Sequence, residues 1–118
     1  AGSKMAAGGD DLRQLKIKTG TLRRTFKELN SYGKEIEAKK AQIARMKESG
    51  EDEADIKKQG EVLAESEMMV PDTKQRLEKA LDDLREIIEK LSEDESVSGS
   101  EDFAAAKAIV EEVQAAAQ

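Results

Sequence analysis

The sequence lacks cysteine, histidine and tryptophan, and aromatic residues make up only 3% of its 118 residues. Without histidine and cysteine, the chain has neither the usual general base of neutral pH nor a thiol nucleophile, and it lacks the common soft metal ligands. We therefore expect no enzyme, no metal site and no cofactor. The absence of cysteine also excludes a disulfide framework. No run of about 18 apolar residues occurs, so no segment is expected to span a membrane.

The apolar residues are too few for a broad core. Hydrophobic residues make up 37% of the chain, with two Phe and one Tyr among them. A helical bundle needs fewer, because its core is a narrow aliphatic stripe along each helix. A chain of this length has room for a single hydrophobic core. The composition therefore predicts one elongated, all-α bundle domain.

The first predicted helix covers residues 11–48. Asp10 or Asp11 is a candidate N-cap, and the Ser49-Gly50 pair marks the end, since glycine tolerates the left-handed dihedrals found after a helix. Residues recur within this helix at alternating steps of four and three, which is typical of a heptad seam. The members of this first seam are Leu15, Thr19, Leu22, Phe26, Leu29, Gly33, Ile36, Lys40 and Ile43.

The second predicted helix covers residues 52–92 and contains Pro71. Its seam keeps phase through the proline, which two helices separated by a turn would seldom do, so we expect one long helix with a kink at Pro71. Proline lacks the N–H that would bond the carbonyl of Glu67, at a cost of about 3 kcal/mol in a helix interior. The members of this second seam are Ile56, Gln59, Leu63, Ser66, Val70, Thr73, Leu77, Ala80, Leu81, Leu84, Ile88 and Leu91.

An acidic, serine-rich loop is expected at residues 92–102, before a short third helix at residues 101–117. Ser98 has capping-box spacing with Glu101, and Ser100 is a competing N-cap. The third helix carries one apolar face, formed by Phe103, Ala106, Val110, Val113 and Ala117.

These elements predict an up-down-up antiparallel three-helix bundle over residues 11–118, with coiled-coil-like packing, because short connections make neighbouring helices antiparallel. Residues 1–10 are predicted to be a flexible N-terminus, in which Ala1–Lys4 resemble a cloning remnant. The short third helix should lie beside roughly residues 75–91. Near the first loop, the seam would then be covered by two helices alone. This partly open seam is a candidate for self-association or for binding a client.

Charge is divided unevenly along the chain, whose net charge is -6. Residues 10–48 contain 11 Lys and Arg against 6 Asp and Glu, whereas residues 49–118 contain 8 against 20. The basic first helix either docks on the acidic remainder of its own domain or attracts an acidic protein surface. Nucleic acid is disfavoured, because the basic residues alternate with glutamate and almost no aromatic side chain is available for stacking.

A few residues break the pattern. Ile17 lies opposite the first seam and Met68 opposite the second, where single exposed apolar residues are common. Met68 is more informative, since Met69 flanks the seam beside it, the proline follows, and Tyr32 is expected at the same level. These residues would form an adaptable apolar spot of the kind that methionine favours at binding surfaces. Gly33 lies on the first seam, where close approach of another helix would explain it.

Five strings carry a resemblance to a known family. They are RQLKIKTG at Arg13–Gly20, SYGKE at Ser31–Glu35, DIKKQ at Asp55–Gln59, ESEMMVPD at Glu65–Asp72 and RLEKALDDL at Arg76–Leu84. In order and spacing, over roughly residues 12–91, they resemble the tubulin-folding cofactor A (tubulin-specific chaperone A) family. The third helix is similar to that family in length and character only. Glu67 and Thr73 depart from it, since the family pattern favours a basic residue near the first position and often has cysteine at the second.

The resemblance implies a three-helix bundle that captures newly folded β-tubulin released by the cytosolic chaperonin and passes it toward αβ-heterodimer assembly, without nucleotide or metal. It implies a cytoplasmic, cytoskeleton-associated protein, with β-tubulin as partner and other tubulin-folding cofactors as further candidates. We expect no nucleic-acid or membrane partner, and a monomer is favoured over a homodimer.

Binding would then rest on charge and shape, with lysines contributing mainly to encounter rate and methionines to residence time. The expected partner-binding residues are Lys16, Ile17, Lys18, Tyr32, Lys57, Lys58, Glu65, Met68, Met69 and Arg76. Pro71 and Gly33 are expected to have structural roles. The alternative is a structural coiled-coil adaptor that dimerises through the partly open seam of the first two helices.

Overall fold

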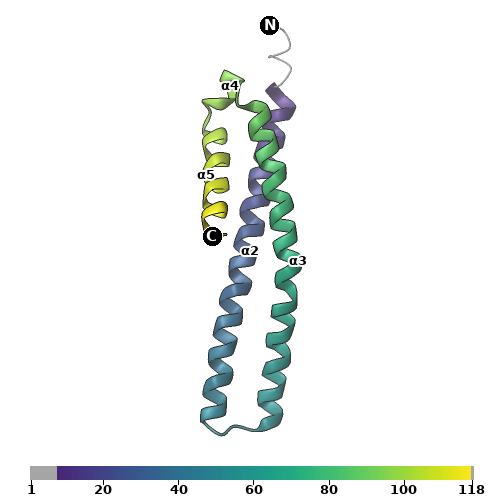
Figure 1. The fold of residues 1–118 in the computed structure, drawn as a ribbon, viewed down its shortest axis with the longest axis vertical. Helices are drawn as coiled ribbons and strands as arrows, with labels where there is room; N and C mark the ends of the chain where they lie inside the picture. The colour runs from purple at the N-terminus through teal and green to yellow at the C-terminus, as the bar shows by residue number, and fades with distance from the viewer. Residues whose placement is uncertain (1–7, 118) are drawn as a thin grey trace. The chain divides into compact units, whose positions relative to one another are not determined.

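A computed structural model describes residues 8–117 of the chain, and every regular element in this range is a helix (Figure 1). The helices are α2 (Gly8–Glu48), α3 (Glu53–Leu91), α4 (Glu95–Ser98) and α5 (Glu101–Ala116). The predicted all-α class is therefore confirmed. The suggested cloning remnant lies outside the described residues. No helix within residues 8–117 is long and apolar enough to cross a membrane.

α2 begins at Gly8, three residues before the predicted start of the first helix. Asp10 and Asp11 lie inside its first turn, where carboxylates complement the positive end of the helix dipole. The helix ends as predicted at Glu48 and is followed by Gly50, whose φ of 68° is left-handed. The N–H of Glu51 donates to the carbonyl of Met46 at 3.0 Å, and the N–H of Gly50 donates to that of Lys47 at 3.2 Å. Together these bonds form a Schellman motif, which stops the helix.

α3 runs without interruption through Pro71, which confirms one helix rather than two. The hydroxyl of Thr73 donates to the carbonyl of Met69 at 2.8 Å, so a carbonyl close to the proline gains a side-chain donor. The kink itself stays a prediction.

The segment between α3 and α5 is not a plain loop as predicted, because Glu95–Ser98 forms the short helix α4. Its N-cap is Asp94, whose carboxylate accepts a hydrogen bond from the N–H of Ser96 at 3.1 Å. Of the two candidate caps for the third helix, Ser100 is the one used. Its hydroxyl accepts from the N–H of Phe103 at 3.1 Å and donates to the carbonyl of Val97 at 2.6 Å.

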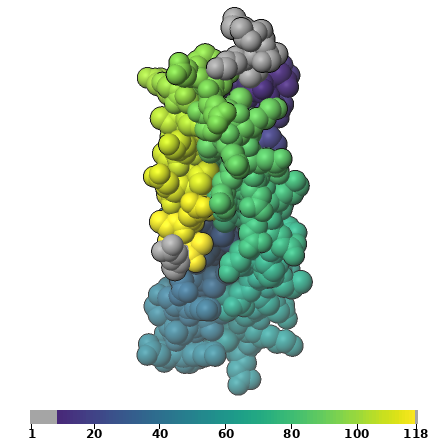
Figure 2. Space-filling model, turned by 45° about the horizontal axis from the view of Figure 1, so that its top comes forward, coloured from purple at the N-terminus to yellow at the C-terminus, as the bar shows by residue number. Residues whose placement is uncertain are grey.

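The chain divides into two compact units. Among the described residues, the three-helix unit comprises 8–26 and 76–117, and the hairpin unit is Lys27–Gln75. In the three-helix unit, the beginning of α2, the end of α3 and α5 alternate in direction, and α5 lies along α3 (Figures 1 and 2). This unit contains the whole cluster of buried apolar residues: Leu15, Leu22, Ala80, Leu84, Ile87, Leu91, Val97, Phe103, Ala106, Ile109, Val110 and Val113.

The width of the buried stripe differs between the units. With Leu15 at position a of a heptad, Thr19 and Phe26 occupy position e in the three-helix unit, where Thr19 is buried and Phe26 packs against the core. A third helix covers position e there as well as a and d. On α5, the buried face includes Ile109, which was not predicted, and excludes Ala117, which is exposed.

In the hairpin unit two helices cover positions a and d alone. Position e of α2 is exposed at Gly33 and Lys40, whereas position d is half-buried at Tyr32 and Lys39. A Cβ added to Gly33 would meet no atom within 4 Å. The prediction that Gly33 permits close approach of another helix is therefore wrong, because no helix of this unit covers that side.

Candidate partner-binding site

A groove follows one side of the hairpin unit, between its two helices, and has a volume of about 410 Å³. Its lining places charged, amide, hydroxyl and apolar side chains together. We call this surface the hairpin groove. It is lined by Glu35, Ala38, Lys39, Gln42 and Arg45 from α2 and by Val62 and Ser66 from α3.

Lys39 is the polar centre of the hairpin groove. It occupies heptad position d, where an apolar residue is usual, and it is half-buried. Its ammonium group donates to the side-chain oxygen of Gln59 at 2.7 Å and to that of Gln42 at 2.9 Å. The bond to Gln59 joins α2 to α3, so this polar layer fixes the register of the two helices.

Exposed apolar side chains lie beside this polar layer on α3. Val62 is 39% exposed and Met69 is 42% exposed. They are seven residues apart and therefore share one side of the helix, directly next to its seam. Met68 is 75% exposed, which is compatible with the predicted apolar spot, since burial would have contradicted it. Tyr32 is half-buried at a seam position of α2.

The other predicted partner-binding residues of the hairpin unit lie on two different sides of α3. Lys58, Glu65 and Met69 lie on the side of α3 that carries Val62, and all are exposed. Lys57 is also exposed but is turned by about 100° around the helix from Lys58.

The other predicted residues belong to the three-helix unit, where they do not form one surface. Lys16 pairs with Asp102 of α5 at 3.6 Å, so it has a partner within its own unit. Ile17 is 49% exposed, and Arg76, also exposed, has an interaction partner. Lys18 lines a separate pocket of about 330 Å³.

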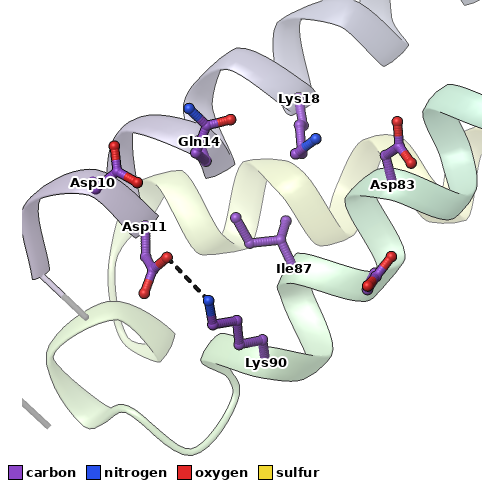
Figure 3. Close-up of a pocket in the computed structure, with 8 residues that line it drawn as sticks. Asp10, Asp11, Gln14, Lys18, Asp83, Ile87 and Lys90 are labelled. Atoms are coloured by element: carbon purple, nitrogen blue, oxygen red, sulfur yellow. Dashed lines mark hydrogen bonds and ion pairs between the residues drawn. The ribbon is translucent and has the colours of Figure 1, made fainter. Parts of the chain in front are cut away.

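That pocket has charges of both signs (Figure 3). α2 contributes Gln14 and Lys18 and α3 contributes Asp83 and Ile87, while Lys90 reaches across to pair with Asp11 at 3.3 Å. No group of three or more acidic, histidine or cysteine residues within residues 8–117 could hold a metal ion.

Sequence reasoning placed none of the seven groove residues in the partner-binding site, although Ser66 was expected in the second seam. A signal for Lys39 was present, since Leu29, Tyr32, Ile36, Lys39, Ile43 and Met46 also recur at steps of three and four. This alternative series passes through Lys39 rather than Lys40. Choosing between the two series requires knowing how many helices cover the seam.

A model of the family described as tubulin binding cofactor A matches residues 10–110. This chain belongs to the tubulin binding cofactor A family. Tubulin-folding cofactor A of Arabidopsis thaliana is 46% identical over 85% of this chain and 88% of its own length. Tubulin-specific chaperone A of Mus musculus is 42% identical over 87% of this chain and 93% of its own. The family resemblance drawn from the five strings is thereby confirmed.

Solved structures of the cofactor A family agree with the fold. The crystal structure of tubulin folding cofactor A from Arabidopsis thaliana matches with a TM-score of 0.77 at 44% identity. It covers 88% of this chain and 95% of that one. The similarity therefore includes the helices of both units.

Proposed function

We propose that this chain is a tubulin chaperone, which binds and holds β-tubulin after its release from the cytosolic chaperonin and passes it toward αβ-heterodimer assembly. The observation that carries the proposal is the family match over residues 10–110, together with relatives named for folding tubulin. The step after the chaperonin and the choice of β-tubulin follow from the resemblance of the sequence strings to that family. Other tubulin-folding cofactors are the proposed recipients of the client.

The proposed mechanism is non-covalent holding. The hairpin unit offers exposed apolar side chains at Met68, Met69 and Val62. It also carries Lys39 and Arg45, which form no ion pair within residues 8–117, and this combination suits an acidic client with an apolar interface. Charge complementarity would speed the encounter, and burial of the methionines would slow release. Holding of this kind keeps an aggregation-prone interface covered until its natural partner arrives.

A pull-down from a cell-free translation of β-tubulin tests the proposed function. Tagged full-length chain should retain free β-tubulin and should retain little assembled αβ-heterodimer, because assembly covers the interface that the chaperone holds. α-Tubulin translated in the same way is the specificity control. Equal retention of free β-tubulin, α-tubulin and heterodimer would contradict the proposal.

The apolar spot can be tested separately. Changing Met68 and Met69 together to Glu should reduce retention of β-tubulin by about tenfold or more, since it places charge at an apolar contact. The matched control changes the exposed residues Ala41 and Ala44 to Glu, which adds the same charge on α2, away from the two methionines of α3. Binding that survives the methionine changes would remove the spot from the interface.

We further propose a monomer. Light scattering at micromolar concentration distinguishes this proposal from the adaptor alternative, which requires a dimer through the seam of α2 and α3. A mass near twice the 12.9 kDa of the chain would favour the adaptor.

A further inference from the structure

We propose that the hairpin groove receives an acidic amphipathic helix of the client, with a carboxylate seated on Lys39. This inference rests on the proposed function and names the part of the client that is recognised. It is distinct from a contact at Met68, which lies on α3 about 180° from the seam, whereas Met69 shares the side of α3 that carries Val62.

The state of the Lys39 ammonium group is the first reason. A lysine ammonium has three N–H donors, and two of them are taken by the neutral oxygens of Gln42 and Gln59. Within residues 8–117, no carboxylate lies within ion-pair distance of Lys39. The residue is half-buried and forms no ion pair within residues 8–117, with Glu35 one helical turn away in the same lining. A carboxylate entering the groove would therefore find a fixed cation with a free donor, at a position more shielded from water than the surface.

The rest of the lining adds a second cation and an apolar contact. Arg45 also has no carboxylate partner within residues 8–117, and it lies about 9 Å along α2 from Lys39 at the helical rise. Two carboxylates about two turns apart on a client helix would match this separation. Val62 lies across the groove on α3 and is partly exposed, so an aliphatic side chain between the two carboxylates would gain apolar contact.

Helical partners suit this groove because its lining repeats along α2 as a helix face does. Glu35, Ala38, Gln42 and Arg45 follow one another at steps of three and four, forming a track between the two helices of the hairpin unit. An amphipathic helix binds such a track through side chains with the same spacing. Glu35 at one end would repel an acidic helix in the wrong register and so select one direction.

Adjacent lysines provide a matched experiment. Lys39 and Lys40 are neighbours, but Lys40 is exposed at position e, outside the groove. The groove variant carries Lys39→Gln and Arg45→Gln, and the control carries Lys40→Gln and Lys47→Gln, so each loses two positive charges. We expect the groove variant to bind cell-free β-tubulin about tenfold more weakly, with a reduced dependence on salt, and the control to change less than twofold. Equal weakening of both variants would overturn the proposal, since general attraction would then explain the effect.

Folding of the variants has its own controls. Thermal unfolding by circular dichroism reports any loss of the hairpin after Lys39→Gln. Lys39→Arg keeps the charge and should restore binding to within threefold of the unchanged chain. If Lys39→Gln unfolds the hairpin, Arg45→Gln alone decides, because Arg45 is exposed: it should weaken binding at least threefold, and unchanged binding would overturn the proposal.

Cross-linking identifies the occupant directly. The chain has no cysteine, so Ala38→Cys places one photo-reactive label in the groove and Ala44→Cys places one outside it. With β-tubulin bound, the Ala38 label should cross-link to a helical segment that carries acidic residues, with at least fivefold higher yield than the Ala44 label. Equal yields, or cross-links to a basic or non-helical segment, would overturn the inference while leaving the chaperone proposal intact. Failure of the unchanged chain to retain β-tubulin would instead refute the proposed function, and this inference with it.

Discussion

The two units are built from the same two long helices, yet one has a core and the other has a seam. In the three-helix unit, Leu15, Leu22 and Leu84 are completely buried, and α5 covers a third side of the pair. In the hairpin unit, the residues classed as buried are Met46 and Thr73, while the aliphatic seam residues are half-buried. The difference shows what a third helix contributes. Its presence, rather than a change in the apolar pattern of positions a and d, gives the three-helix unit a buried core and leaves the hairpin unit with a partly exposed seam.

The largest expected effect is in the core of the three-helix unit. Leu84→Ala should lower the free energy of unfolding by about 3 kcal/mol, because it leaves a cavity at a fully buried site. Leu63→Ala, the same change at a half-buried seam position of the hairpin unit, should cost about 1 kcal/mol. Urea denaturation followed by circular dichroism measures both. Similar losses would mean that the seam is as well packed as the core.

Loss of the N-cap of α5 should have the next largest effect on stability, because α5 is the third helix that the hairpin unit lacks. Ser100→Ala removes the acceptor of the Phe103 N–H and should cost about 1 kcal/mol. Ser98→Ala is the control, since Ser98 has capping-box spacing without being the cap, and it should change stability by less than about 0.5 kcal/mol. The order of the two melting temperatures decides which serine caps α5.

Glycine substitutions examine the uncovered side of the hairpin unit. Gly33→Ala should stabilise the chain by about 0.5–1 kcal/mol, since alanine favours the helix and the added Cβ meets no atom within 4 Å. Gly50→Ala should instead destabilise it, because the φ of 68° is unfavourable for alanine. A destabilising Gly33→Ala would indicate that something covers this side of α2 after all.

The smallest effect is expected for the exposed ion pair of the three-helix unit. Lys16 and Asp102 are 59% and 43% exposed, so Lys16→Ala should change stability by less than about 0.5 kcal/mol. Tubulin retention by the same variant is informative, because Lys16 is also a predicted partner-binding residue. An unchanged affinity would remove Lys16 from the predicted binding surface.

The helices were predictable because their signals are local. Glycine at the left-handed end of α2, serine at the start of α5 and the unbroken phase across Pro71 each depend on a few neighbouring residues. The predicted start of α2 is three residues late, because Asp10 and Asp11 have the side chains of an N-cap but lie within the first turn. The short helix α4 was missed for a similar reason, because a serine-rich acidic stretch usually forms a loop.

The candidate site was only partly predictable. Exposure of Met68 and Met69 followed from their helical phase, and the structure agrees. The groove around Lys39 did not follow, because the sequence supports two seams, one through Lys40 and one through Lys39. Both series have the spacing of a helix face. Between residues 29 and 43 they share every second member, and each remaining member of one series is the sequence neighbour of a member of the other.

By itself, then, the sequence determined where the long helices lie and which residues form position a of α2, because helical periodicity and capping are properties of adjacent residues. Tertiary structure alone decided which neighbouring positions are covered. Position e is apolar and packed at Phe26, where α5 supplies a third partner, but bare at Gly33, where two helices are all that the unit contains. Burial of these positions depends on a segment far away in the chain, and no local pattern records it.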